Sequence, residues 1–274
     1  MKPAAAAVMV ATVAAVAVVA AAALRRAGAE EDMAHIPAGE YLPLYAESDA
    51  DGRPAETKTK RVAGFYLDRD AVSNGEFLEF VKQHPRWQKS RAPALFADGN
   101  YLAHWRGDLS PGENMSAPAV NISWFAARAY CRWRGKILPS VAQWEYAAMA
   151  DETSPFAARD NRAFRERIMQ WYAGPAGIAP EKPGEKFENI HGVRGMHGVV
   201  WEWTRDFNNA LVTGASRSDS SASRNLFCGG GALGASDFSD YAAFMRFAFR
   251  SSLNGNYAVS SLGFRCAREA GLDA

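Results

Sequence analysis

The sequence predicts a single α+β domain built from short helices, short strands and long loops. The chain has 274 residues, which is the size of one large domain. Its hydrophobic content of 48%, with 8 Trp residues, is enough for a sizeable core. Helix-capping patterns and short alternating stretches are separated by segments rich in Gly, Pro and polar residues. These observations favour many short elements over a few long ones.

The charge of the chain is nearly balanced, with 31 basic and 30 acidic residues and a net charge of +1. A broad nucleic-acid-binding surface needs a clustered excess of Lys and Arg. We therefore expect no nucleic-acid partner.

Residues 1–29 have the pattern of a secretory signal peptide. Lys2 is followed by a long run dominated by Ala and Val, and the tripeptide Ala27-Gly28-Ala29 supplies a small-x-small cleavage site. Cleavage after Ala29 would leave residues 30–274 as one exported domain, in the periplasm or otherwise outside the cytoplasm.

The alternative for the same segment is an uncleaved membrane anchor, because about 20 apolar residues suffice to span a bilayer. However, Arg25 and Arg26 would place positive charge on the wrong side for an anchor whose N-terminus faces the cytoplasm. Both interpretations imply export, and the protein contacts the membrane only if the segment is uncleaved.

The domain begins in residues 34–45, and a strand is predicted at residues 62–67. This strand alternates apolar side chains with small or polar ones. Residues 46–60 between the two stretches are polar and contain turn residues, which indicates a surface loop.

Three helices are predicted in the first half of the chain. Ser73 and Glu76 form a capping box, and that helix ends at His84. The second helix starts at Ser123, and the third starts at Ser140, which forms another capping box with the residue three positions on. The expected buried faces contain Phe77, Phe80 and Val81, then Ala126, Ala127, Tyr130 and Cys131, and finally Trp144, Ala147 and Ala148.

From Asp151 to the end of the chain, helix signals are scarce, and few regular elements are expected. Residues 201–203 alternate like a short strand. Residues 208–225 are rich in Ser and Asn and indicate a long exposed loop.

Four motifs occur together in one order along the chain. They are PAVNISWFAARAYCRWRGKILPSVAQWEYAA (118–148), GVRGMHGVVWEWTRDF (192–207), FCGGGA (227–232) and SSLGFRCA (260–267). From about Met33 to Arg268 the chain resembles the formylglycine-generating enzyme family, also called the sulfatase-modifying-factor family. The resemblance implies that family's irregular single-domain α+β fold, which is related to the C-type lectin fold.

Within that family, the chain resembles members that mature pyoverdine or accompany copper nitrite reductase. The stretch MRFAFRSSLNGNY (245–257) looks closest to the second group. These members imply an accessory role rather than sulfatase activation.

The resemblance also implies a disulfide between Cys131 and Cys266, and an oxidising compartment after export is consistent with it. The alternative is two buried free thiols. Cys228 is then left over, just before Gly229 and Gly230. It is a weak candidate for a catalytic or metal-binding thiol at the rim of the family's active site, and the alternative is a small buried residue.

The family's copper-dependent oxidases hold Cu(I) between two thiolates that lie shortly after this Gly segment, because soft ligands select a soft ion. Residues 229–250 of this chain contain no Cys. We therefore predict that the protein has no thiolate copper site.

One calcium site of the family lies in a Gly-Asn-Val-Trp-Glu-Trp segment, and here Val199 replaces the Asn. Glu202 and backbone oxygens remain as hard ligands for Ca²⁺. The alternative role of Glu202 is an internal salt bridge or hydrogen bonds to backbone amides. His191 and His197 flank a Gly-rich turn and could converge on a metal ion.

The resemblance assigns a groove and its structural support to a small set of residues. Arginines in this set are expected to stack on aromatic rings and to bond carbonyls, with Asp206, Asp237 and Asp240 as partners. The set comprises Trp201, Glu202, Trp203, Gly229, Gly230, Arg246, Arg250 and Arg265.

Three functions compete on these observations. The first is an exported accessory or maturation protein, with or without redox chemistry, that acts on an exported enzyme or metabolite. The second is a ligand- or protein-binding module on a lectin-related fold, with residues 208–225 as a recognition loop. The third is a formylglycine-generating oxidase acting on a sulfatase cysteine, which the missing cysteine pair disfavours.

Overall fold

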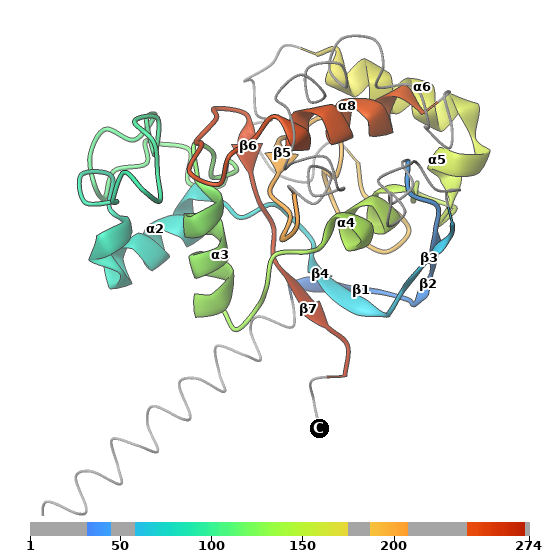
Figure 1. Cartoon of the computed structure of the whole chain (residues 1–274), viewed down its shortest axis with the longest axis horizontal. Coiled ribbons are helices and arrows are strands. Elements are labelled where there is room, and N and C mark those ends of the chain that lie inside the picture. The colour runs from blue at the N-terminus through green and yellow to red at the C-terminus, as the bar shows by residue number, and fades with distance from the viewer. Residues whose placement is uncertain (1–31, 45–57, 175–186, 208–239, 272–274) are drawn as a thin grey trace, which may run out of the picture.

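The computed structural model describes residues 32–44, 58–174, 187–207 and 240–271 (Figure 1). Its strands are β1 (Met33–Ile36), β2 (Gly39–Tyr41), β3 (Lys60–Val62), β4 (Phe65–Asp68), β5 (Trp201–Glu202), β6 (Leu262–Gly263) and β7 (Ala267–Glu269). Its helices are α2 (Asn74–Gln83), the short 3-10 helix η1 (Pro85–Trp87), α3 (Trp124–Trp133), α4 (Val141–Ala148), α5 (Ala157–Asp160), α6 (Arg162–Tyr172) and α8 (Tyr241–Ser251). This mixture of short elements confirms the α+β class.

The described strands form three small sheets. Antiparallel β1, β4 and β7 make the largest, with Met33 opposite Asp68 and Leu67 opposite Ala267. Because β7 comes from the end of the chain and β1 from the beginning, one sheet joins both ends of the domain. The other sheets are the antiparallel pair β2–β3 and the parallel pair β5–β6. No helix in the described ranges is long and apolar enough to cross a membrane.

The single strand predicted at residues 62–67 is wrong. The chain forms β3 and β4 instead, separated by Ala63 and Gly64. The reason is a change of sheet at this corner, because β3 pairs with β2 while β4 pairs with β1 and β7. Val62 and Phe65 are both buried although they are three residues apart, so the alternation is interrupted at Ala63 and Gly64, the point at which the chain changes sheets.

The three predicted helices are confirmed, together with their N-terminal caps. Ser73 Oγ accepts from the Glu76 amide at 3.3 Å, and the Glu76 carboxylate accepts from the Ser73 amide at 2.9 Å. Ser140 and Gln143 make the same reciprocal pair at 3.1 and 2.8 Å. These bonds satisfy backbone donors that the helix leaves unpaired.

The expected scarcity of helices after Asp151 is wrong, since α5, α6 and α8 all lie there. Asn161 caps α6 through its side chain, and Asp240 caps α8. In α8 the buried residues are Ala242, Arg246 and Arg250, spaced four apart. The inward face of α8 therefore carries charge, and a search for apolar periodicity overlooks such a helix.

The largest hydrophobic core lies around a disulfide between Cys131 of α3 and Cys266, which immediately precedes β7. The two Cα atoms are 5.6 Å apart, and both residues are fully buried. Tyr130 and Phe264 pack ring to ring beside it, with centroids 5.3 Å apart. This is the pair implied by the family resemblance, and it fastens α3 to the largest sheet. Cys228 lies outside the described residues.

Replacing both cysteines in a Cys131→Ala/Cys266→Ala variant should reduce the free energy of unfolding by about 5 kcal/mol, because the bridge closes a loop of 135 residues. Urea denaturation of the variant and of the wild type measures the loss. Cys228→Ala is the matched control and should unfold like the wild type. A cross-link to Cys228 in an unreduced peptide map would contradict the assignment.

Candidate functional site

A pocket of about 90 Å³ lies between α4, the end of α6, the segment that leads into β5, and α8. Its apolar side is aromatic, and its charged side is formed by arginines of α8. The lining includes Trp171, Tyr172, Trp201, Phe249, Arg246 and Arg250. Concave sites of this kind, apolar with a few polar groups, are where ligands usually bind.

The aromatic side of the pocket is built by close packing of segments that are distant in sequence. Trp201 of β5 stacks on Phe249 of α8 with centroids 4.7 Å apart, and Tyr172 of α6 lies 5.1 Å from Trp201. Gly198 has a φ of +75°, and a Cβ there would lie 2.6 Å from the Trp171 Cβ. Glycine at 198 therefore allows the segment to approach α6.

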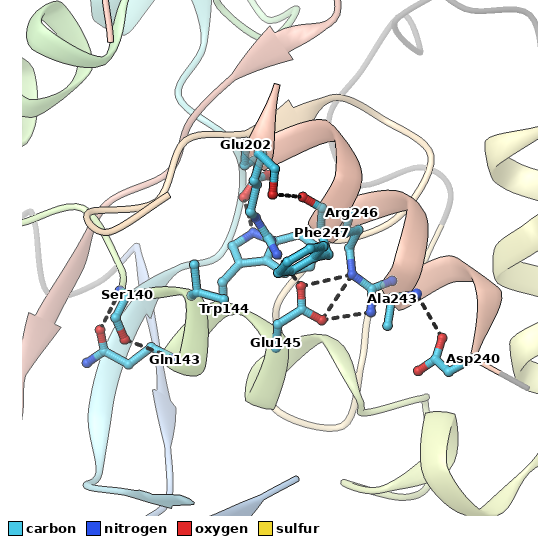
Figure 2. A network of polar contacts seen from close by, with 12 residues as sticks. Ser140, Gln143, Trp144, Glu145, Glu202, Asp240, Ala243, Arg246 and Phe247 are labelled. Atoms are coloured by element: carbon cyan, nitrogen blue, oxygen red, sulfur yellow. Dashed lines mark hydrogen bonds and ion pairs between the residues drawn. The ribbon is translucent and has the colours of Figure 1, made fainter. Parts of the chain in front are cut away.

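The charged side depends on Glu145 of α4, which points toward α8 (Figure 2). Arg246 donates to its carboxylate from Nε at 3.0 Å and from Nη2 at 2.7 Å, and Arg250 donates to it from Nη1. All three side chains are buried. Burial alone would raise the pKa of Glu145, but the charges of Arg246 and Arg250 outweigh it and lower the pKa to about 2.

Trp144 lies beneath both arginines and links this pair to a second one. The guanidinium carbons of Arg246 and Arg250 lie 5.6 and 4.9 Å from its ring centroid, which is within cation–π range. Its indole N–H donates to Glu202 Oε2 at 2.7 Å. The same tryptophan thus contacts both buried ion pairs.

Glu202 and Arg265 form a completely buried ion pair behind the pocket, with 0% exposure of both side chains. Arg265 donates from Nε and Nη2 to the carboxylate at 2.8 Å each. Its remaining N–H groups donate to the carbonyl oxygens of Asp68, Arg69 and Arg194 at 3.0–3.1 Å. Every donor of this guanidinium is therefore satisfied.

A hydrogen-bonded chain extends from Arg246 to His197. Arg246 Nη1 donates to the Tyr172 hydroxyl at 3.2 Å, and that hydroxyl lies 3.0 Å from His197 Nδ1. His197 Nε2 lies 2.9 Å from the Ala148 carbonyl oxygen, which only accepts, so Nε2 carries the proton and Nδ1 accepts from the phenol. Burial, reinforced by the charge of Arg246, lowers the pKa of His197 to about 3.

The expected metal ligands at this site are already engaged in other bonds. Both oxygens of Glu202 are bonded to Arg265, and one also to Trp144, so a cation on them would face a guanidinium at hydrogen-bond distance. His197 uses both ring nitrogens. Glu202 as a calcium ligand stays a prediction, and ligation would require the bonds of its carboxylate to rearrange. Nowhere in the described residues do three or more His, Cys, Asp or Glu side chains group as metal ligands do.

The structure brings Trp201, Glu202, Arg246 and Arg250 together around Trp144, and Arg265 lies behind them. Trp203 belongs instead to the core around the disulfide. Gly229 and Gly230 lie outside the described residues, as does Cys228.

The carboxylates that form ion pairs with these arginines are Glu145 and Glu202, whereas the expected partners were aspartates. Of the expected aspartates, Asp240 contributes its charge to Arg246 and so raises the pKa of that arginine. Asp206 accepts from the Val141 amide, and Asp240 caps α8 through the Ala243 amide, as Figure 2 shows for the latter. Asp237 lies outside the described residues. Asp206 and Asp240 thus each accept a hydrogen bond from a backbone N–H in the first turn of a helix, which is a common role for a carboxylate.

Neither Glu145 nor Tyr172 was expected at a site from the sequence. One signal is the spacing of Arg246 and Arg250, which are four residues apart: in a helix they share a face, and if that face is buried they require an acid nearby. The sequence offers no way to choose Glu145 among the 30 acidic residues.

Comparison with known proteins decides the family. A model of the sulfatase-modifying factor enzyme 1-like domain matches residues 19–270. The chain belongs to this family.

Relatives of this sulfatase-modifying-factor protein carry different names. Mouse (Mus musculus) inactive C-alpha-formylglycine-generating enzyme 2 is 28% identical over 284 residues, covering 87% of this chain and 86% of the relative. The formylglycine-generating enzyme of Streptomyces coelicolor is 28% identical over 294 residues, covering 90% and 92%. The solved structure of PvdO from Pseudomonas aeruginosa gives a TM-score of 0.47 at 20% identity, covering 86% of this chain and 94% of that one.

Glu202→Gln should destabilise the protein by about 3–5 kcal/mol, because it leaves the charge of Arg265 buried and unpaired. Glu79→Gln is the matched control, since it breaks an exposed pair with Lys82 that contributes at most about 1 kcal/mol. Chemical denaturation measures both. The loss should be the same with calcium and with a chelator; a loss that appears only in calcium would indicate that Glu202 is a ligand.

Protonation of His197 should destabilise the fold as the pH falls. Its pKa is about 3 in the folded state against 6.5 unfolded, so the unfolded chain binds a proton first, and stability present above pH 6.5 is lost toward pH 3. Between pH 7 and pH 4 the wild type should lose about 3 kcal/mol more than His197→Gln, at about 1.4 kcal/mol per pH unit. His35→Gln, at an exposed position of β1, should follow the wild type. Parallel curves for all three proteins would refute the assignment.

Proposed function

We propose that the protein is an exported accessory or maturation factor that acts on an exported enzyme or metabolite and does not convert cysteine to formylglycine. One observation carries the proposal: the family's fold and a pocket are present, while residues 229–250 contain no Cys. A pocket without the two copper thiolates supports a protein that binds its partner or metabolite, or modifies it without thiolate-bound copper.

The remaining cysteines are poor replacements for the missing pair. Cys131 and Cys266 are joined to each other and fully buried, so neither offers a thiolate. Cys228 alone would give Cu(I) one soft ligand where the family uses two, and carboxylates are hard substitutes.

The names of the relatives agree with a family in which the oxidase activity is not universal. One relative is named a formylglycine-generating enzyme and another an inactive one, at the same 28% identity to this chain. Export, the second part of the proposal, is supported by the signal-peptide pattern of residues 1–29.

Deletion of the gene should leave an exported protein or metabolite unmodified, visible as a mass difference in the exported fraction of the cells. The full chain should restore the mass, whereas a chain lacking residues 2–29 should not, because it stays in the cytoplasm. Identical exported fractions with and without the gene would remove the accessory role.

A second arm of the same experiment tests the chemistry. Copper-loaded protein is incubated with a sulfatase-type cysteine peptide, oxygen and a reductant, with an active formylglycine-generating enzyme as the positive control. Mass spectrometry should show an unchanged peptide. Turnover that disappears in Cys228→Ser would make that cysteine catalytic and overthrow the proposal.

A further inference from the structure

We propose that the pocket binds a small aromatic carboxylate, with its carboxylate on Arg250 and its ring against Trp201 and Phe249. This inference rests on the proposed function, because it specifies the chemical class of the metabolite on which the protein acts. It is carried by three observations: the charge around the pocket, the unused donors of Arg250 and the aromatic wall formed by the stacked rings of Trp201 and Phe249.

The charge around the pocket favours an anion. Arg246 and Arg250 share the single negative charge of Glu145, and Glu202 is neutralised by Arg265. These three arginines and two glutamates leave one positive charge among the side chains that line or directly support the pocket; Asp240, which also acts on Arg246, lies outside the lining. Since the three arginines and two glutamates are all buried, water screens that charge weakly, and a bound anion would gain more from it than at the surface.

The donors of Arg250 show where the anion would bind. In an arginine, the N–H groups of Nε and Nη2 point the same way and match the two oxygens of a carboxylate. Arg246 holds Glu145 with this edge, and Arg265 holds Glu202 with it.

Arg250 uses only Nη1, on Glu145. Its Nε and Nη2 bond to no group within the described residues, although the side chain is only 9% exposed and lines the pocket. Neither nitrogen is among the fully buried unpaired atoms of the described residues, so both are open to a ligand carboxylate or to water.

The aromatic wall favours a flat ring beside that carboxylate. Trp201 and Phe249 are stacked on one another, with centroids 4.7 Å apart and an interplanar angle of 26°, and both are only partly buried, so a further ring can extend this stack or contact the ring edges. The volume of about 90 Å³ is well below the 300–1,000 Å³ or so of pockets for drug-sized ligands, so it suits a single ring rather than a fused system. A cationic ligand would be repelled by Arg250, and a simple anion would leave the wall uncovered.

The test uses the mature full-length protein and benzoate as the probe, with tryptophan fluorescence as the readout because Trp144, Trp171 and Trp201 line the pocket. Benzoate should quench saturably at neutral pH. Benzyl alcohol keeps the ring without the charge, and acetate keeps the charge without the ring; each should bind at least tenfold more weakly. Equal binding of benzyl alcohol would overturn the role of Arg250, and equal binding of acetate would overturn the role of the wall.

Two variants locate the site. Arg250→Met should weaken benzoate binding at least tenfold, but it also removes a bond to Glu145 and can unfold the protein. Val199→Glu keeps that bond and places a negative charge at a half-buried position of the lining, so it should weaken binding by a similar factor. Leu109→Glu, at an exposed loop position, is the control and should bind like the wild type. Unchanged affinity in a folded Val199→Glu protein would refute the site.

The same variant separates this inference from the proposed function. If Val199→Glu no longer restores the exported product in the deletion strain while Leu109→Glu does, the pocket is the site of action. If Val199→Glu restores it fully, the pocket inference fails and the accessory role stands. An unaltered exported fraction in the deletion strain removes the accessory role, whatever the pocket binds.

Discussion

The irregular fold depends on the buried ion pair between Glu202 and Arg265. Its strands are short, and β5 and β6 have two residues each, so sheet hydrogen bonds alone fix little of the structure. Arg265 compensates by bonding the carbonyls of Asp68, Arg69 and Arg194 while it holds Glu202. A buried charge without its partner is strongly destabilising, so these segments have to assemble together.

The same constraint shapes the pocket. Glu145 and the two arginines of α8 form a second buried group, and Trp144 touches both groups. Since the inward stripe of α8 is mainly charged, the position of this helix is set by a carboxylate on α4 as much as by apolar packing. The helix in turn supplies Phe249 and Arg250 to the pocket. The arginines that fix the position of α8 therefore also line the pocket.

Whether an interaction could be predicted from the sequence depends on how far apart its two residues lie along the chain. Ser73 with Glu76 and Ser140 with Gln143 are three residues apart, so their capping boxes and helices are visible in the sequence. Glu145 and Arg246 are 101 residues apart, and no local pattern pairs them. α8 could not be predicted for a related reason: two of its three buried residues are arginines, and apolar periodicity indicates a helix only where the buried face is apolar. The motif around Glu202 places β5 at the site, whereas Glu145 of α4 and Tyr172 of α6 could not be assigned to it from the sequence.

The scaffold and the family's oxidase chemistry are physically separable. The disulfide, the core around it and both buried ion pairs form although residues 229–250 contain no Cys, so these supports of the fold do not require the family's two copper thiolates. The cavity beside α8 is likewise present in a chain whose residues 229–250 contain no Cys. The cavity is lined by two arginines and by stacked aromatic rings, and under the proposed function these groups would select ligands by charge and shape. In that proposal recognition and oxidation depend on different side chains, so one can be kept without the other.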